Sequence, residues 1–541
     1  MTLREKITAK IEGLIPKGTD VSLSVPENDT QGHYSTNVAF KLAKQKGVSP
    51  MEEAEKLASK LLESASPKTV AKRLFGQAEL FERVEAVTPG FLNMWLSQNA
   101  LASELQIILK EKKNYGIVKS KKKKKIQVEY ISANPTGPLT LANGRGGFFG
   151  DALSNILEAA GNAVEREYYV NDTGNQILTF GKSIIASLGI IPTEEEFYKG
   201  EYVREWAKKN KSFVLKHKNN PMEIGKRAAK DFLRGTRNTI EKGAHIKFDR
   251  YTSEDRNIHK KGYVKKALAV FKKGGRVYEQ DGAVWLRTKD FGDDKDRVLV
   301  KQGGEPTYFL ADAGHYLETK ERKFDAKINI LGPDHYGYVA RIQAVAKIFG
   351  LDSRVIVTQT IRLVSDGKET KMSKRKGKFI TFEELISEVG RDAARFFFLM
   401  TTPESHMDFD LKLAKERSQK NPVFYIQYAL VRALSILKKS KIKTSAKASL
   451  DALQTDVDTK LIRELARFPE VIADSAKDYK IHPITKYASE LAKAFHNFYE
   501  KERVAGEAKN IAQARAVLVS ASIIVFQNLF KILGISAPKK M

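Results

Sequence analysis

The stretch IQVEYISANPTGPLTLANGRGG, which runs from Ile126 to Gly147, decides the fold of the middle of the chain. It opens with alternating apolar residues, Ile126, Val128 and Tyr130, as a β-strand does. It then breaks at Asn134-Pro-Thr-Gly-Pro138, a run that fits neither a helix nor a central strand. Small residues follow and lead into an apolar pattern at helical spacing. The stretch therefore predicts a strand, a Gly/Pro loop and a helix.

This strand, loop and helix predict a place where phosphate can approach the main chain. Backbone N–H groups at a helix N-terminus carry partial positive charge, and the loop before them has little side-chain bulk. A nucleotide is the expected ligand. An ordinary βα turn of an α/β domain has the same pattern, so this stretch alone leaves both interpretations open.

A second stretch, KETKMSKRKGK from Lys368 to Lys378, carries five lysines and one arginine in eleven residues. By itself it predicts a solvated basic loop, as most charge runs do. Together, however, the two stretches resemble the Lys-Met-Ser-Lys loop and the His-Ile-Gly-His turn of the class I aminoacyl-tRNA synthetases. In that family the two loops close over ATP from opposite sides. The resemblance implies that Met372 and Lys374 bind ATP and that Lys371, Ser373 and Lys374 act in catalysis.

The first stretch most resembles the arginyl-tRNA synthetases, in the run from Ser132 to Leu139 and in Gly144-Arg145-Gly146. Where that family usually has His, Ile or Val, Gly and His, this chain has Thr140-Leu-Ala-Asn143. Threonine and asparagine still donate hydrogen bonds to phosphate oxygens, although neither carries the charge of an imidazolium. The same residue types resemble the motif of tryptophanyl-tRNA synthetases, so we expect Thr140 and Asn143 to act in catalysis. The ATP-binding residues implied on this side are Pro138, Thr140, Ala142, Asn143 and Gly144.

One residue of the divergent motif bears on adenine binding. A glycine at this place would let adenine lie against the backbone, whereas the methyl group of Ala142 takes up part of that room. The sequence leaves open whether the replaced motif slows the activation of the amino acid.

Length and composition set the broad class of the protein. The 541-residue chain, of 60.7 kDa, is too long for one hydrophobic core and predicts several domains. Its 93 lysines and arginines against 65 aspartates and glutamates give a formal net charge of +28, which favours a polyanionic partner such as nucleic acid. The absence of cysteine excludes disulfides, a thiolate nucleophile and cysteine-ligated zinc, and we expect no metal site held by the protein alone.

The same composition bears on location. No apolar run is expected to span a membrane, and the N-terminus lacks the apolar core of a secretory signal. We therefore expect a cytoplasmic protein without a membrane partner.

Three domains are predicted. Residues 1–110 form a small α+β domain and resemble the N-terminal extension of arginyl-tRNA synthetases, which implies contact with the elbow of the tRNA; packing for stability is the alternative role. Residues 126–400 alternate strands and helices, which predicts a Rossmann-like, doubly wound parallel-sheet catalytic domain with a charged helical insertion at about residues 190–265. Residues 401–541 are helical and resemble the all-α anticodon-binding bundle of that family. A lysine-rich linker, residues 119–125, joins the first two domains.

The substrate pocket implied by the resemblance suits a guanidinium ion, which is planar and permanently charged and is best held by carboxylates and amide oxygens. The implied arginine-binding residues are Glu129 on the first strand, Asn134 in the turn, and Tyr308 and Asp312 in a Tyr-x-x-x-Asp run. If that run is helical, Tyr308 and Asp312 face the same way; the alternative role for Asp312 is a helix cap. His335 follows an apolar strand, and the family places it in the adenosine pocket, although a lone histidine is more often structural.

The C-terminal third has the charge and the side chains that RNA binding requires. Residues 421–541 include 20 basic and 11 acidic side chains. Unpaired anticodon bases stack on aromatic side chains, for which Tyr425, Tyr428, Phe495 and Tyr499 are candidates, although several of them are expected to be core. The tRNA-binding residues implied by the resemblance are Tyr425, Gln427, Tyr428 and Met541.

The resemblance covers essentially the whole chain and implies an arginine--tRNA ligase. ATP, with Mg²⁺, would activate L-arginine to arginyl-adenylate, and the arginyl group would pass to the 2′-hydroxyl of the terminal adenosine of tRNA(Arg), with release of AMP and pyrophosphate. The family is also implied to activate arginine only with tRNA bound, and to be monomeric. Two alternatives remain: another class I synthetase, and a catalytically impaired tRNA-binding paralogue whose activating motif has decayed. Drift should have damaged the lysine loop and the pocket as well, so the enzyme is favoured.

Overall fold

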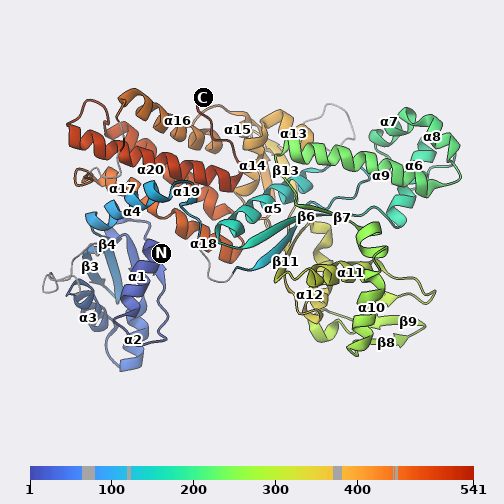
Figure 1. Ribbon diagram of the computed structural model, residues 1–541, viewed down its shortest axis with the longest axis horizontal. Coiled ribbons are helices and arrows are strands. Elements are labelled where there is room, and N and C mark those ends of the chain that lie inside the picture. Colours follow the sequence, from blue (N-terminus) through green and yellow to red (C-terminus); the bar gives the residue numbers. More distant parts are fainter. Residues whose placement is uncertain (64–79, 119–122, 370–379, 443, 445–448) are drawn as a thin grey trace.

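A computed structural model describes residues 1–63, 80–118, 123–369, 380–442, 444 and 449–541. Figure 1 shows an N-terminal domain and a C-terminal helical bundle at one end of an elongated molecule, and the parallel sheet near its middle. Four of the residues predicted to act at the ATP site lie outside the described residues, namely Lys371, Met372, Ser373 and Lys374.

The N-terminal domain is a four-stranded antiparallel sheet covered by helices, as its α+β pattern predicts. Helix α1 (Leu3–Glu12) begins with a capping box, in which Thr2 and Glu5 satisfy each other's free backbone N–H groups. Its stripe of Leu3, Ile7 and Ile11 is buried in the core. The strands lie in the order β1 (Leu23–Ser24), β2 (Tyr34–Thr36), β4 (Phe91–Leu96), β3 (Phe81–Val87), and the other helices are α2 (Val38–Lys46) and α3 (Pro50–Glu63).

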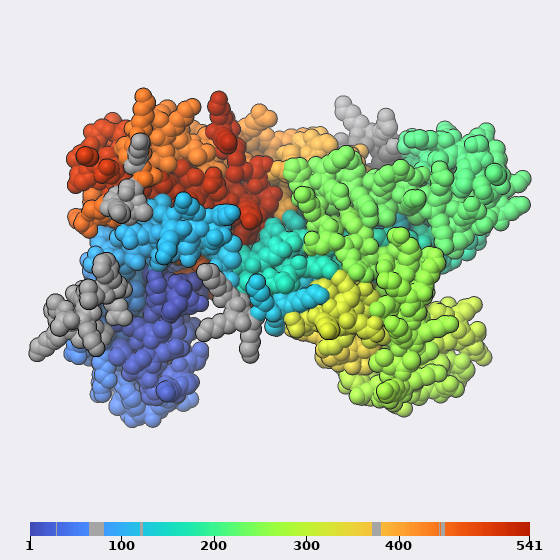
Figure 2. Space-filling model, viewed as in Figure 1, coloured from blue at the N-terminus to red at the C-terminus, as the bar shows by residue number. Residues whose placement is uncertain are grey.

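A fourth helix, α4 (Gln98–Glu111), joins this domain to the helical bundle, because it packs against α17 (Asp456–Ala466) and α20 (Lys509–Leu533). In Figure 2 the light-blue residues around position 100 lie against the orange and red C-terminal residues. The two ends of the chain therefore form one continuous surface at this side of the molecule.

The central sheet is parallel throughout, which confirms the Rossmann-like prediction. Strand β5 (Lys125–Glu129), predicted from the opening stretch, lies in the middle, with β6 and β11 on its two sides. The chain passes from β5 to β6 through α5 (Leu141–Ala159), and it reaches β11, on the other side of β5, much later. The strand order therefore reverses beside β5. Ligands bind at such a reversal, beyond the carboxyl ends of the strands. The full order is β12 (Asp352–Val357), β11 (Ala326–Leu331), β5, β6 (Ala163–Val170), β7 (Arg250–Ser253).

The two faces of β5 meet different surroundings. Ile126 and Val128 are buried on the side that α5 covers. Gln127 and Glu129 point to the opposite face, which is covered by α11 (Tyr308–Glu321): the Thr319 hydroxyl donates to Gln127 Oε1 at 2.9 Å. This second face is both polar and buried, because Gln127 is 0% and Glu129 7% exposed.

Helix α6 (Asn175–Ser187) follows β6 in the chain. Residues 190–265 then contain α7 (Glu201–Lys209), α8 (Lys211–Lys216), α9 (Pro221–Asn238) and the start of α10 (Tyr263–Lys273). They also contain β7, which pairs with β6 in the central sheet. A small antiparallel sheet then follows in the order β10 (Arg297–Val300), β9 (Ala283–Leu286), β8 (Val277–Gln280). Helix α12 (Val339–Ile348) lies between β11 and β12 in the chain.

The C-terminal part of the chain is helical, as predicted, except that a short strand, Met407–Asp410, lies within residues 401–541, which were expected to be all-α. A small sheet of β13 (Ile361–Ser365), β14 (Lys368–Glu369) and β15 (Met407–Asp410), with α13 (Phe382–Val389), α14 (Arg391–Leu399) and α15 (Leu411–Lys415), leads into the bundle. The bundle helices are α16 (Pro422–Ser440), α17, α18 (Phe468–Asp478), α19 (His482–Lys501) and α20.

Helix α20 corrects one sequence expectation. Its 25 residues are long and apolar enough to cross a membrane by length and composition, a run that the sequence analysis did not expect. In the fold, however, most of its apolar stretch is buried, and α20 packs against α16, α17 and α4. A helix that is apolar on nearly all sides is what the centre of a bundle requires.

Candidate active site and RNA interface

A cleft of about 730 Å³ opens at the carboxyl ends of β5, β6 and β11, where the strand order reverses. The loop after β5 and the first turn of α5 form one wall, and the first turns of α11 form another. Nine of the residues predicted for ATP and for arginine meet in this single cleft. Those that line it are Glu129, Asn134, Pro138, Thr140, Ala142, Asn143, Tyr308, Asp312 and His335.

A strained turn brings the chain from β5 into the cleft. Ile131 and Ser132 have positive φ angles of 65° and 36°, a conformation that a β-branched residue rarely adopts. Two hydrogen bonds hold the turn: Ser132 Oγ accepts from the Tyr169 backbone N–H at 3.1 Å and donates to Glu129 Oε1 at 3.2 Å. The turn thus ties the loop to β6 and fixes one edge of the Glu129 carboxylate.

The divergent motif forms the N-terminus of α5. Thr140 is the N-cap, and its hydroxyl accepts from the Asn143 backbone N–H at 3.3 Å. In return, Asn143 Oδ1 accepts from the Thr140 backbone N–H at 2.9 Å and from the Thr140 hydroxyl at 2.8 Å. Because this oxygen takes two hydrogen bonds, the amide group of Asn143 keeps its two N–H donors for a ligand.

The N-terminus of α5 is joined to the chain that follows the lysine stretch. Thr140 and Thr381 form an antiparallel β-bridge, and the Phe382 backbone N–H donates to the Leu139 carbonyl at 2.9 Å. In the sequence, Thr381 follows the lysine stretch by three residues.

Gly144, predicted to bind ATP, has a packing role in this structure. A Cβ atom on it would lie 2.1 Å from the Phe382 ring, so only glycine lets α13 approach α5 this closely. It is not among the residues that line the cleft. Its neighbour Arg145 is also structural: it is 1% exposed, its guanidinium donates to the carbonyls of Gln359 and Thr402, and burial lowers its pKa to about 10.

The cleft also has acidic residues in its lining, Glu129, Glu254 and Asp312. Helix α11 begins at Tyr308 with Thr307 as its N-cap, so Asp312 is an interior helical residue and not the cap of the alternative interpretation. Tyr308 and Asp312 both line the cleft, one helical turn apart, and Tyr308 is 65% exposed. Asn134 Oδ1 accepts from the amide of Asn171 at 2.9 Å, which fixes the orientation of the Asn134 side chain.

Asp312 has an unusual environment for a carboxyl group. Burial is the main cause that raises its pKa, to about 7, and the nearby Glu254 adds to the effect. The Tyr338 hydroxyl donates a hydrogen bond to Asp312 and partly opposes the shift. The group therefore changes its charge near neutral pH, and a cationic ligand favours its ionised form.

Among the side chains of this cleft that sequence reasoning did not assign are Tyr169, Glu254, Asn329 and Tyr338. Tyr169 and Asn329 lie near the carboxyl ends of β6 and β11, and Glu254 follows β7 directly. The rule that ligands lie beyond the ends of parallel strands would have indicated all three. Tyr338 ends the turn after β11, and only its contact with Asp312 reveals it.

One cluster near the cleft has the composition of a metal site. Glu129, Glu167 and His315 each offer a ligand atom, and these atoms lie within 4.8 Å of one another. The ammonium nitrogen of Lys327 lies among them, 2.9 Å from Glu129 Oε2 and 3.4 Å from Glu167 Oε2. A lysine therefore already supplies the positive charge that a metal ion would bring.

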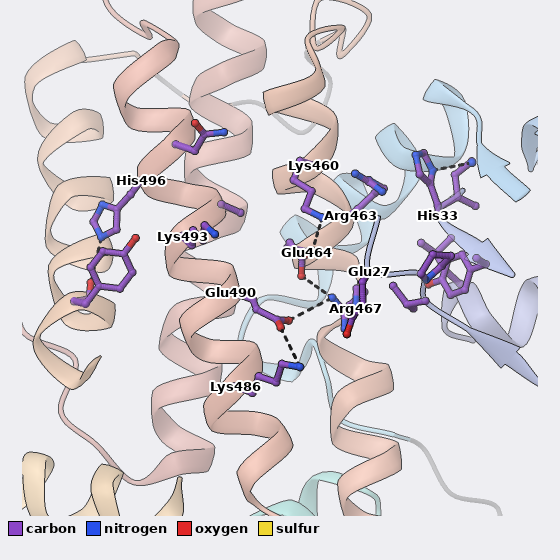
Figure 3. A pocket seen from close by; sticks show the side chains of 18 of the residues that line it. Glu27, His33, Lys460, Arg463, Glu464, Arg467, Lys486, Glu490, Lys493 and His496 are labelled. Carbon is purple, nitrogen blue, oxygen red and sulfur yellow. Dashed lines mark hydrogen bonds and ion pairs between the residues drawn. The ribbon is translucent and has the colours of Figure 1, made fainter. Parts of the chain in front are cut away.

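A groove of about 820 Å³ lies between the N-terminal domain and the bundle. Figure 3 shows Glu27 and His33 on one side of it and side chains of the α17 and α19 region on the other. Part of the basic charge is paired within the groove. The Arg467 guanidinium lies 2.9 Å from the Glu464 carboxylate, and the Lys486 ammonium lies 3.9 Å from the Glu490 carboxylate. The basic residues that line the groove are Lys460, Arg463, Arg467, Lys486 and Lys493.

Aromatic side chains of α16 and α19 gather beside this groove. Tyr425 lines it and packs on His496, with ring centroids 4.5 Å apart. The guanidinium of Arg432 lies 4.4 Å from the ring centroids of both Tyr428 and Tyr499. Phe495 is fully buried and belongs to the core, which the sequence analysis expected of several members of this set.

The two other residues predicted to bind tRNA differ in exposure. Gln427 is 9% exposed, and its amide donates to Asp392 Oδ2 and to the Ser536 carbonyl, both at 3.0 Å. Its side chain is therefore buried, and its two hydrogen bonds hold the C-terminal tail against α14. Met541, by contrast, is 50% exposed.

Comparison with known proteins covers the whole length of the chain. Residues 1–96 match the family described as Arginyl tRNA synthetase N terminal domain, residues 104–397 match tRNA synthetases class I (R), catalytic domain, and residues 426–541 match DALR anticodon binding domain. A protein named Arginine--tRNA ligase from Caldanaerobacter subterraneus subsp. tengcongensis is 39% identical, over 98% of this chain and 96% of that protein. One of the same name from Citrifermentans bemidjiense is 37% identical, over 100% and 99%.

The likeness extends to solved structures. The structure of Thermus thermophilus arginyl-tRNA synthetase matches with a TM-score of 0.75 and covers 100% of both chains. At 20% sequence identity, this likeness shows the fold alone.

Proposed function

The chain belongs to the arginyl-tRNA synthetase family, and from this premise we propose that it is an arginine--tRNA ligase whose reaction takes place in the cleft at the end of β5. The enzyme activates L-arginine with ATP to arginyl-adenylate and then transfers the arginyl group to the 2′-hydroxyl of the terminal adenosine of tRNA(Arg). The products are AMP, pyrophosphate and the charged tRNA.

The observation that carries this proposal is that one cleft is lined by groups of two kinds. The N-terminus of α5 offers backbone dipoles and the amide of Asn143, which suit phosphate. The carboxyl groups of Glu129 and Asp312 suit a guanidinium. Arginyl-adenylate contains both a phosphate and a guanidinium, so the lining of the cleft matches the intermediate of this reaction.

Arginine enters with its side chain toward α11. Asp312 ionises and pairs with the guanidinium, Glu129 accepts from it at the floor of the cleft, and the exposed ring of Tyr308 covers it. Asn134, held by Asn171, binds the polar head of the amino acid. This arrangement leaves the arginine carboxylate directed toward α5.

ATP enters as its Mg²⁺ complex and lies against the first turn of α5. Pro138, Ala142 and His335 surround the adenosine, while Thr140 and Asn143 lie at the phosphates. The β-bridge between Thr140 and Thr381 supports a contact between the lysine stretch and the same nucleotide. Lys371 and Lys374 would then hold the β- and γ-phosphates, with smaller roles for Met372 and Ser373.

The reaction consists of two substitutions, the first at the α-phosphorus of ATP and the second at the carbonyl carbon of the adenylate. The arginine carboxylate attacks the α-phosphorus in line, and pyrophosphate leaves with the electrons of the broken P–O bond. The 2′-hydroxyl of the tRNA then attacks the carbonyl carbon of the adenylate, and AMP leaves. Positioning and stabilisation of charge are the main contributions of the protein in both steps.

The tRNA contacts both ends of the chain. The groove of Figure 3, with its five basic residues, borders the N-terminal domain and the bundle at once. Tyr425 and Tyr428 offer stacking surfaces beside it, and the exposed Met541 adds an apolar contact. The N-terminal domain would meet the elbow of the tRNA and the bundle its anticodon. We further propose that the protein acts as a cytoplasmic monomer.

The impaired paralogue is not favoured by the site. Thr140 and Asn143 form an ordered capping box in the cleft, and the carboxyl groups of Glu129 and Asp312 both line it. The test is aminoacylation of total tRNA with radiolabelled arginine, with labelled lysine and cysteine as controls for other class I synthetases. Charging with arginine alone supports the proposal; bound tRNA that is never charged would leave the paralogue as the function.

A further inference from the structure

A fully buried lysine contacts one of the acidic residues that line the cleft. Lys327 on β11 is 0% exposed, and its ammonium nitrogen donates to Gln127 Oε1 at 2.6 Å and contacts Glu129 Oε2 at 2.9 Å. A third acceptor, Glu167 Oε2, lies at 3.4 Å. A buried ammonium is stable only when its donors are satisfied in this way.

The network joins three adjacent strands and the helix above them. Lys327 is the register partner of Gln127, and Glu129 is the partner of Glu167, so these side chains lie on the same face of the sheet. From α11, His315 Nε2 lies 3.1 Å from Glu167 Oε2. The contacts therefore fix side chains on β11, β5 and β6 relative to α11, which carries Asp312.

Three members of this network line the cleft, Glu129, His315 and Asn329, whereas Glu167 and Lys327 are not among the residues that line it. Glu129 is the one of the three that brings a carboxylate to the cleft. Its Oε2 atom is engaged twice, by Lys327 and by the amide of Asn329 at 2.7 Å. Its Oε1 atom takes one hydrogen bond among the described residues, from the Ser132 hydroxyl. A carboxylate oxygen has two lone pairs, so Oε1 keeps acceptor capacity for a ligand.

Two buried carboxylates this close together would disfavour each other's charge. Burial opposes ionisation of Glu167, but His315 and Lys327 hold its pKa well below its usual range. Burial likewise disfavours the ammonium of Lys327, yet Glu129 and Glu167 raise its pKa above its ordinary value. Glu167 and Lys327 are thus both charged at neutral pH. The ammonium of Lys327 balances one of the two carboxylates, Glu129 and Glu167.

We propose that Lys327 is a positioning residue for the amino-acid substrate: by holding Oε2 of Glu129, it turns the Oε1 edge of that carboxylate toward the guanidinium. The inference rests on the proposed function, because it requires arginine as the ligand of the cleft. It assigns Lys327 no contact with substrate and no part in the chemical step. Its loss therefore weakens arginine binding and leaves ATP binding and the phosphoryl-transfer geometry as they are.

The experiment compares three variants in arginine-dependent ATP–pyrophosphate exchange with tRNA present. Lys327→Met removes the ammonium at similar volume, but it leaves the buried Glu129 carboxylate without its ammonium partner and is expected to fold poorly. Glu167 keeps the guanidinium groups of Arg250 and Arg322, at 3.6 and 3.9 Å. The decisive variant is therefore Lys327→Met/Glu167→Gln, which removes one positive and one negative charge and keeps the net charge of the network. Glu167→Gln alone is the matched control, since it keeps the contact between Lys327 and Glu129.

The double variant should melt near the wild-type temperature, with a KM for arginine raised at least about tenfold, on the scale of one lost charge-assisted hydrogen bond, and a KM for ATP within about twofold. Glu167→Gln should match the wild type in both constants. If the double variant binds arginine as well as Glu167→Gln does, Lys327 is only a counter-charge and the proposal fails. A parallel loss in both KM values and kcat would show a merely structural role and would also overturn it.

The same assay separates this inference from the function on which it rests. A wild-type protein that exchanges pyrophosphate with another amino acid, or with none, contradicts the proposed function before any variant is compared. Wild-type exchange with arginine and an unchanged KM in the double variant contradicts only the role of Lys327.

Discussion

Asn143 Oδ1 accepts hydrogen bonds from both the backbone N–H and the hydroxyl of Thr140, at 2.9 and 2.8 Å. This pair stands at the two places where the resemblance to the class I synthetases implies histidine. It closes the N-terminus of α5 with a capping box and leaves the Asn143 amide donors for the ligand, which we propose is phosphate. The turn thus offers neutral donors in place of groups that gain and lose a proton near pH 6.5.

Replacement of Asn143 by aspartate separates capping from catalysis. Aspartate keeps an oxygen for both Thr140 donors and suits a helix N-terminus, so the melting temperature should not fall. It replaces the amide donors by a negative charge beside phosphate, and the exchange rate should fall at least about a hundredfold, as for a lost oxyanion donor. Thermal melting and pyrophosphate exchange check the two parts. Wild-type turnover in Asn143→Asp would exclude the amide from phosphate binding.

The KM for arginine should depend on pH through Asp312. Because the pKa of this carboxyl group is about 7 without ligand and the guanidinium prefers the ionised form, arginine affinity rises as pH increases and levels off above neutrality. Between pH 6 and pH 8 the KM should fall by about tenfold, the ratio expected for one proton. Asp312→Asn should raise the KM and remove its pH dependence.

Tyr338→Phe provides the control for that profile. The Tyr338 hydroxyl lowers the pKa of Asp312, so its removal should move the KM curve to higher pH without changing its shape. A curve that stays in place would mean that another group titrates.

Lys374→Ala should lower the exchange rate at least about a hundredfold, since this lysine is proposed to hold the leaving pyrophosphate. Lys378→Ala removes the same charge outside the four-residue motif and should stay within about twofold. The exchange rate of both variants is measured as a function of ATP concentration. Equal losses of rate in the two variants would indicate a general charge effect instead of a specific contact.

Substitution of Gly144 tests how α5 packs on α13. A Cβ atom there would lie 2.1 Å from Phe382, so Gly144→Ala should destabilise the fold by about 1–3 kcal/mol in urea unfolding. The control is Gly235→Ala in α9, where the described residues leave the space around the new atom open. That change should be neutral or stabilising by about 0.5–1 kcal/mol.

Tyr428→Leu should raise the KM for tRNA about tenfold, which corresponds to one lost stacking contact. The KM values for arginine and ATP should not change, since Tyr428 lies on α16, outside the cleft. Gln427→Ala makes a useful contrast. It removes the two hydrogen bonds to Asp392 and Ser536, so its first effect should be a lower melting temperature.

Local pattern was sufficient for the parts of the site that are close in sequence. The alternation from Ile126 to Tyr130 and the Gly/Pro run after it predicted β5, the loop and α5. The spacing of Tyr308 and Asp312 predicted that both face the same way on a helix, and both line the cleft.

Long-range packing explains what the sequence did not reveal. Gln127 and Glu129 alternate with apolar residues, a pattern typical of a solvated strand face, but α11 covers that face and Lys327 balances its charge. Gln427 lies on an amphipathic helix, yet the C-terminal tail returns over it through Ser536. Neither fact can be read from the residues near each position.

The proposed function is tested most directly by ATP–pyrophosphate exchange with each of the twenty amino acids, with and without total tRNA. We expect exchange with arginine in the presence of tRNA and with no other amino acid. Because one cleft is lined by both kinds of group, such a result would assign both at once. Retained tRNA binding without exchange for any amino acid would contradict the proposed function and would show that the turn from Thr140 to Asn143 does not activate arginine.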